Sequence, residues 1–141
     1  MSLSKAQVRE YRELAESGVQ VRRNNNIRPN TGSETARHLL IKSLAAHIGL
    51  EARYRVDSET PVETGSGGDS AIDVLLWGHD SRLTYAVEVE TSPLPKVIES
   101  KVDKYVRQTA IDDMLVLNVA ECPDDMTQAY GWVASELGLP A

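Results

Sequence analysis

Three carboxylates are the residues of this chain best suited to chemistry. Asp73 lies in an apolar run, residues 71–77, while Glu88 and Glu90 lie in a second run, residues 83–90. Both runs are rich in β-branched and aromatic residues and are separated by a short turn-forming segment, so they predict the two strands of an antiparallel hairpin. The sequence therefore predicts three acids on neighbouring strands.

The length of the turn decides how these strands pair. A four-residue loop would pair Gly78 with Leu83, and the same register sets Asp73 directly opposite Glu88, with Glu90 on their face. Directly opposed residues have Cβ atoms about 4.5–5.5 Å apart, so like charges there repel unless a cation intervenes. A hard, oxygen-binding divalent cation such as Mg²⁺ fits that need, with Asp73, Glu88 and Glu90 as its candidate ligands.

A solvated sheet face, where acids are routine, is the alternative interpretation. The pattern around the acids argues that both faces are covered, and covered acids are usually paired or bind metal. Leu75 and Ala71 accompany Asp73. The opposite face is expected to carry only apolar residues, namely Ile72, Val74, Leu76, Val87 and Val89.

The composition indicates one domain without disulfides. The chain has 141 residues, enough to bury a core. We divide it into an N-terminal helix and basic arm, residues 1–32, and a core, residues 33–141. The single Cys122 excludes an internal disulfide and, with three scattered histidines, provides no zinc spacing. The start of the chain has no apolar signal run and no segment predicts a membrane span, so we expect a soluble, cytoplasmic protein with no membrane contact.

Charge is unevenly distributed along the chain. The net charge is −6, but residues 1–56 hold ten Lys/Arg against five Asp/Glu, whereas residues 57–141 hold five against sixteen. A basic segment beside an acidic site suits a metal-dependent enzyme that acts on nucleic acid, because the cations can contact phosphates and the carboxylates can bind metal.

Hydrophobic spacing predicts a helix and strand order of helix, helix, three strands, helix, strand, helix. A capping box, Ser4 to Gln7, begins the first helix. The predicted helices are residues 4–17, 33 to 47 or 48, 96–108 and 125–137; the predicted strands are residues 51–57, 71–77, 83–90 and 114–119. Residues 58–70 are rich in Gly and Ser and predict a flexible loop that could cover the site or contact substrate.

Glu34 is a further candidate catalytic acid. It lies seven residues before Ile41 on the buried stripe of the second helix, and could point towards the acidic hairpin. Alternatively, Thr31 to Glu34 is itself a capping box, in which an acid simply suits the first helical turn. His38, one turn further on, is expected to flank the buried face without binding anything.

Arginines are concentrated in a polar, turn-rich segment, residues 19–32. Arg22, Arg23 and Arg28 occur there among four asparagines, which predicts an exposed arm. Arginine and asparagine donate well to phosphates and base edges, so these arginines are the candidate nucleic-acid contacts. The alternative is a merely solvated loop.

The element order from residue 33 onward, with acids at these places, resembles the PD-(D/E)XK nuclease superfamily, which has the restriction-endonuclease-like fold. The family pattern is an Asp on the second core strand, Glu-x-Lys on the third and an optional Glu on the first helix. Asp73, Glu88 and Glu34 stand at those positions. Archaeal Holliday-junction resolvases in this superfamily have the helix acid. The resemblance implies an α/β fold with an αβββαβ core, a mixed four-stranded sheet flanked by helices, plus the N-terminal helix.

One position departs from the pattern. Glu90 stands where most members have Lys, although some restriction enzymes carry Glu-x-Glu. A replacement lysine could come from the next helix, where Lys101 to Tyr105 has the spacing of the Gln-x-x-x-Tyr motif of RecB-like members. Lys101 would then face the site; alternatively, its aliphatic stem only covers the helix flank.

The resemblance implies cleavage of DNA phosphodiesters with Mg²⁺, or with Mn²⁺ as a substitute. Asp73 and Glu88 would hold the metal, Glu90 and Glu34 would assist, and Lys101 would stabilise developing charge. A homodimer is expected, with one site per strand of a duplex. Two rival hypotheses remain: a catalytically inactive DNA-binding or assembly module of the same fold, and a metal-dependent hydrolase of another phosphate substrate.

Overall fold

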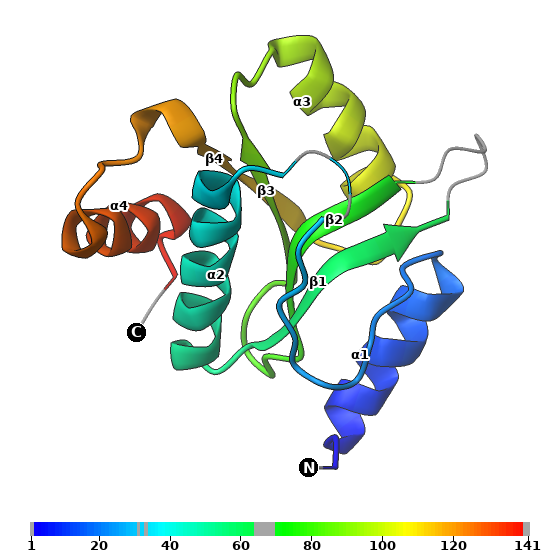
Figure 1. Cartoon of the computed structure of the whole chain (residues 1–141). Coiled ribbons are helices and arrows are strands. Elements are labelled where there is room, and N and C mark those ends of the chain that lie inside the picture. Colours follow the sequence, from blue (N-terminus) through cyan, green and yellow to red (C-terminus); the bar gives the residue numbers. More distant parts are fainter. Residues whose placement is uncertain (1, 31, 33, 64–69, 140–141) are drawn as a thin grey trace.

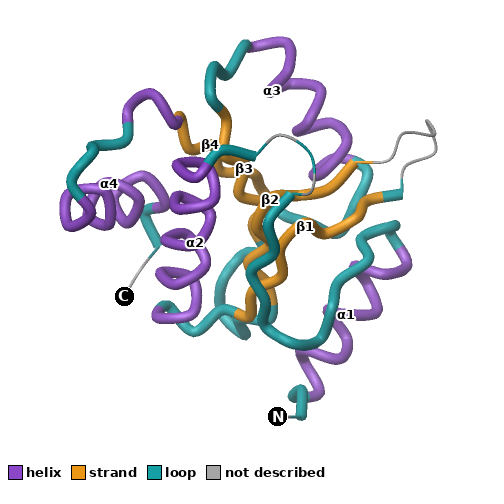
Figure 2. The backbone as a smooth tube through the Cα atoms, viewed as in Figure 1, coloured by secondary structure: helices purple, strands orange, loops and turns teal. Residues whose placement is uncertain are grey.

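The computed structural model describes residues 2–30, 32, 34–63 and 70–139 and shows one sheet between helices (Figure 1). Its elements, in chain order, are α1 (Lys5–Glu16), α2 (Ala36–Glu51), β1 (Arg55–Val62), β2 (Ser70–Trp77), β3 (Tyr85–Glu90), α3 (Pro95–Val102), the π-helical turn η1 (Asp103–Arg107), β4 (Asp113–Asn118), the 3₁₀ turn η2 (Val119–Glu121) and α4 (Met126–Leu137). Figure 2 shows the strands as a continuous central layer.

The sheet has the strand order β1-β2-β3-β4. β1 pairs antiparallel with β2, β2 antiparallel with β3, and β3 parallel with β4, so the sheet is mixed. Val74 pairs with Val87 and Leu76 with Tyr85. This is the register predicted from the turn, and it confirms both the hairpin and an α/β architecture with a mixed four-stranded sheet.

Helices cover both faces of the sheet. On one face α2 and α4 pack over Val56, Val74, Leu76 and Val87. On the other face α1 and η1 pack over Leu75, Trp77 and Ala86. Apolar burial on both faces is the main source of stability in such a layered fold.

Ile72 corrects one expectation about these faces. It was expected beside Val74 and Leu76, but it belongs to the core under α1 and η1. The usual alternation of side chains is therefore interrupted next to Asp73. Glu59, which the register sets across from Asp73, has φ of +45°, and this left-handed residue locally breaks the extended backbone of β1.

The predicted start and end of the second helix were wrong. Thr35 caps α2 by accepting a hydrogen bond from the His38 backbone N–H at 3.1 Å, so the helix begins at Ala36 rather than in a capping box at Thr31. Gly49 does not end it. A Cβ on Gly49 would lie 2.5 Å from Leu76 Cδ2, so this glycine allows α2 to approach the sheet closely.

β1 begins later and ends later than predicted. Residues 51–54 finish α2 and form a turn in which Arg53 has φ of +70°. The strand then runs to Val62, through residues assigned to the Gly/Ser-rich loop. The remainder of that predicted loop, residues 64–69, lies outside the described residues.

Residues 19–30, called the basic segment from here on, do not form the exposed arm that was expected. Asn26 N–H donates to the Val56 carbonyl at 3.2 Å, Ser58 accepts the Arg28 N–H at 2.7 Å, and Val19 bridges to Val62. These contacts lie along β1, an outer strand of the sheet. The segment therefore satisfies an edge that would otherwise be open to another strand.

α3 differs from the other helices because none of its residues is fully buried. It follows β3 and continues into η1, where the buried Tyr105 donates its hydroxyl to the Ala71 carbonyl at 3.3 Å. This contact ties the end of the helix to β2. Across the described residues, no helix has the length and apolar character needed to cross a membrane.

Candidate active site

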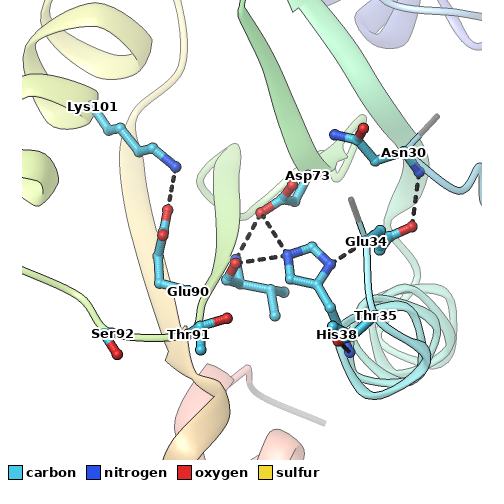
Figure 3. Close-up of a pocket in the computed structure, with 10 residues that line it drawn as sticks. Asn30, Glu34, Thr35, His38, Asp73, Glu90, Thr91, Ser92 and Lys101 are labelled. Carbon is cyan, nitrogen blue, oxygen red and sulfur yellow. Dashed lines mark hydrogen bonds and ion pairs between the residues drawn. The ribbon is translucent and has the colours of Figure 1, made fainter. Parts of the chain in front are cut away.

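A polar pocket of about 320 Å³ opens where β2 and β3 diverge (Figure 3). Within the described part of the chain, the backbones of these strands pair from Val74 to Leu76 on β2 with Tyr85 to Val87 on β3. Beyond this pairing, the pocket takes residues from the basic segment, α2, β2, the end of β3 and α3: Asn30, Glu34, Thr35, His38, Asp73, Val89, Glu90, Thr91, Ser92 and Lys101. Elements far apart in the sequence thus supply its wall.

Asp73 and Glu88 hold the end of the hairpin through their side chains. Glu88 Oε2 accepts the Asp73 backbone N–H at 2.9 Å, and Asp73 Oδ2 accepts the Val89 backbone N–H at 2.8 Å. Each carboxylate therefore bonds to the opposite strand, as the predicted register requires for directly opposed residues.

Burial makes this pair of acids electrostatically unfavourable. Glu88 is 1% exposed. Its burial, together with the charge of Asp73, raises the pKa of Glu88 to about 8, although Lys101 opposes the shift. Burial also raises the pKa of Asp73, and Glu59 adds to that effect. Near neutral pH the two acids compete to be ionised, as two carboxylates in one site do.

Lys101 lies against these acids. Its Nζ donates to Glu88 Oε1 at 3.0 Å and also to Glu90 Oε1. Burial works against the charge of Lys101, but the two carboxylates outweigh it and raise the pKa of the ammonium group above its ordinary value. The helix after β3 thus brings one permanent cation to the site, from a position where the sequence offered either a site lysine or a flanking one.

Glu34 reaches the pocket wall with its carboxylate already engaged. It accepts hydrogen bonds from Asn30 N–H at 2.8 Å and His38 Nδ1 at 2.6 Å, and it pairs with Lys42 Nζ at 3.0 Å. Burial raises the pKa of Glu34, but these three donors outweigh it and hold the pKa below its ordinary value. Glu34 is therefore an ionised carboxylate that acts on its neighbours.

His38 and Lys42 were not predicted as part of this site. His38 contacts both Glu34 and the Val89 carbonyl, and Lys42 is fully buried between Glu34 and Glu59. The signal that could have identified them is their spacing, because Glu34, His38 and Lys42 recur every four residues, and His38 and Lys42 lie on one side of α2 with Glu34 just before its start.

The three candidate DNA-contacting arginines have different surroundings. Arg22 is turned inward, where its guanidinium donates to the Ser58 carbonyl at 3.0 Å and lies 3.5 Å from Asp57. Arg23 lies over the ring of Tyr11 at 4.9 Å. The side chain of Arg28 is exposed, while its backbone bonds to β1. Arg23 and Arg28 are exposed, whereas the side chain of Arg22 is 34% exposed and its guanidinium is bonded to β1.

The donor chemistry of the pocket suits a hard divalent cation. Asp73, Glu88 and Glu90 present carboxylate oxygens in a region with an excess of negative charge, which is what Mg²⁺ or Mn²⁺ requires. Within the described residues, however, no three His, Cys, Asp or Glu side chains form a ready-made metal-binding group. Glu90 is turned to Lys101, so it would have to reorient before it could join the other two acids.

Comparisons of the chain with protein-family models, with curated proteins and with solved structures found no match.

Proposed function

We propose that this protein is a divalent-metal-dependent DNA endonuclease with a restriction-endonuclease-like core, related to the PD-(D/E)XK superfamily. The observation that carries the proposal is the opposed pair Asp73 and Glu88, which is buried at a pocket and has Lys101 beside it. Two acids and one lysine at the point where a mixed sheet opens can bind a cation and a phosphate together. Phosphoryl chemistry depends mainly on such placement of charge.

The acids would supply the metal site. Asp73 and Glu88 would hold Mg²⁺ or Mn²⁺, and Glu90 would assist after turning from Lys101. When bound, the cation supplies polarisation of the scissile phosphate and lowers the pKa of a coordinated water. Because burial and the charge of Asp73 raise the pKa of Glu88 to about 8, Glu88 would release a proton when a cation binds near neutral pH.

Lys101 would act on the substrate itself. Its ammonium group stays charged and is partly exposed to the pocket, with 28% of its side chain accessible. It can therefore donate a hydrogen bond to a non-bridging phosphate oxygen while two negative charges hold it in place. Exposed arginines of the basic segment, Arg23 and Arg28, would contact the DNA backbone.

The test is cleavage of supercoiled plasmid, linear duplex and four-way junction DNA with Mg²⁺, Mn²⁺ or EDTA. Asp73→Ala and Lys101→Ala should each abolish metal-dependent cleavage. Asp80→Ala in the exposed turn and Lys104→Ala in η1 are the matched controls and should cleave as the wild type does. Cleavage that persists in EDTA or in Asp73→Ala would refute the proposal.

An inactive DNA-binding or assembly module is a second candidate, and one observation favours it. Lys101 already pairs with both Glu88 and Glu90 without any metal. Such a module would bind DNA equally well in EDTA and after replacement of Asp73. Metal-independent binding without cleavage would therefore select this candidate.

A homodimer would let two sites cut the two strands of a duplex. Sizing chromatography with light scattering at micromolar concentration, with and without duplex DNA, tests this. A monomer under both conditions would count against double-strand cleavage by a dimer.

A further inference from the structure

Val89 occupies an unusual place in the sheet. It lies on β3 beyond the residues whose backbones pair with β2, yet its N–H and its carbonyl both contact side chains. Its N–H donates to Asp73 Oδ2 at 2.8 Å, and its carbonyl lies 2.8 Å from His38 Nε2. Side chains of β2 and α2 therefore replace a strand backbone where the hairpin opens.

His38 makes this replacement from the first turn of α2. Its Nδ1 lies 2.6 Å from Glu34 Oε1, so its two ring nitrogens face a carboxylate oxygen and a carbonyl oxygen. In this arrangement each ring nitrogen of His38 is directed at an oxygen atom of the protein.

Glu34 is in turn fixed from the other side. Lys42, which has no exposed surface, pairs with Glu34 at 3.0 Å and with Glu59 at 3.1 Å, and its Nζ donates to the Arg28 carbonyl at 2.8 Å. The chain of contacts runs from a buried lysine through Glu34 to His38. It ends at Val89 and, 3.9 Å from His38 Nε2, at Asp73 Oδ2. Figure 3 shows the imidazole between Glu34 and Asp73.

We propose that His38 is a positioning residue. Glu34 orients its ring, and His38 holds the Val89 carbonyl and the Asp73 carboxylate at the open end of the β2–β3 hairpin. This inference deepens the proposed function and rests on it for the catalytic readout. His38 touches neither the scissile phosphate nor a metal in this role. It acts through Asp73: His38 holds the carbonyl of Val89, and the N–H of Val89 donates to the Asp73 carboxylate.

The test compares His38→Ala and His38→Gln with His47→Ala. His47 is a matched control, since it lies on the same helix and also pairs with an acid four residues away, Glu51, at 3.3 Å, but it is 63% exposed. Glutamine is the conservative variant because its amide can still donate to Val89. Thermal unfolding establishes that each variant is folded.

Three readouts are measured on the full chain: hydrogen exchange, Mn²⁺ binding and DNA cleavage. Hydrogen exchange of the Val89 amide should be about tenfold faster in His38→Ala, and the Kd for Mn²⁺ should rise about tenfold, which is the low end for loss of a supporting contact. The kcat for DNA cleavage should fall with little change in KM. His38→Gln should recover part of each effect, and His47→Ala should match the wild type.

The outcomes separate this inference from the proposed function. If His38→Ala leaves Val89 exchange and Mn²⁺ binding within twofold of the wild type, the positioning role is refuted. If the wild type neither binds Mn²⁺ nor cleaves DNA, the proposed function fails, and the exchange measurement alone decides whether His38 holds the strand.

Discussion

Two buried acids, Asp57 and Glu88, lie on separate strands of the same sheet, and their negative charges have different surroundings. Asp57 on β1 has no exposed surface and accepts hydrogen bonds from Asn26 at 2.6 Å and Thr60 at 2.6 Å, with Arg22 at 3.5 Å. Glu88 on β3 is equally buried, but Asp73 lies opposite it. One acid is surrounded by donors, and the other faces a second acid.

Under the proposed function, this difference distinguishes a structural carboxylate, Asp57, from a catalytic pair, Asp73 and Glu88. Asp57 ties the basic segment to the sheet edge, and its donors are all supplied by the chain. Burial raises the pKa of both Asp73 and Glu88, and the charge of Asp73 raises that of Glu88 further, so Lys101 compensates the charge of the pair only in part. In the proposed function, a cation from outside would supply the compensation that this pair of acids lacks.

The most direct test of this comparison removes the charge of each acid in turn and compares the cleavage rates of the two variants. Asp73→Asn should reduce metal-dependent cleavage about a thousandfold, equivalent to about 4 kcal/mol, because it removes a ligand charge. Asp57→Asn should leave the rate of the folded protein within about threefold of the wild type. Initial rates at saturating Mg²⁺ measure both. Equal losses in the two variants would mean that the sites are not functionally different.

Stability should respond in the reverse order. Asp57→Ala leaves Asn26, Thr60 and Arg22 without their acceptor, so the free energy of unfolding should fall by about 3 kcal/mol. Asp73→Ala should cost less than about 1 kcal/mol in the absence of metal, because it also relieves repulsion with Glu88. Urea denaturation in EDTA provides the measurement. A larger loss for Asp73→Ala than for Asp57→Ala would contradict the assignment of Asp57 as the structural acid.

The pH dependence of stability should reveal the strained pair. The pKa of Glu88 is raised from 4.5 to about 8 in the folded protein, so the folded state binds its proton more tightly than the unfolded state does. In EDTA, stability should therefore be highest below pH 4.5 as far as Glu88 is concerned, and should fall as pH rises to about 8, by at most about 1.4 kcal/mol per unit.

Glu88→Gln is the matched variant for that experiment. It cannot ionise, so the decline between the two pKa values should flatten, and Mg²⁺ should no longer stabilise the protein at pH 8. A Glu88→Gln curve that runs parallel to the wild type would show that Glu88 is not the titrating group.

The sequence predicted the parts of this site that depend on local rules. Turn length set Asp73 opposite Glu88, because the register follows from the period of strands. The resemblance to a family motif offered Lys101 as a site lysine, with a flanking position as the alternative. The sequence failed where distant contacts decide. Thr35 caps α2, while Glu34 bonds to Lys42 and His38. His38 also contacts Val89 on β3, so the surroundings of Glu34 and His38 could not be predicted from the residues next to them in the sequence.

The basic segment shows the same limit. Its asparagines and arginines read as exposed because they are polar, yet Asn26 and Arg22 pack on β1, where the strand edge offers unpaired backbone groups. Polarity predicts solvent contact only when no such edge is near.

The arginines of this segment provide the smallest and most specific test of the comparison. Arg28 has an exposed side chain, so Arg28→Ala should raise the Kd for duplex DNA about threefold and reduce the slope of log affinity against log salt by about one. Arg22→Ala should instead lower stability by about 1 kcal/mol, because Arg22 belongs to the Asp57 site. Fluorescence anisotropy across a salt series, together with urea denaturation, distinguishes the two effects. We expect Arg28→Ala to change the salt dependence of DNA binding and Arg22→Ala to change stability. If Arg22→Ala changes only the salt dependence and Arg28→Ala changes only stability, the assignment of Arg22 to the sheet edge and of Arg28 to a DNA-facing surface is wrong.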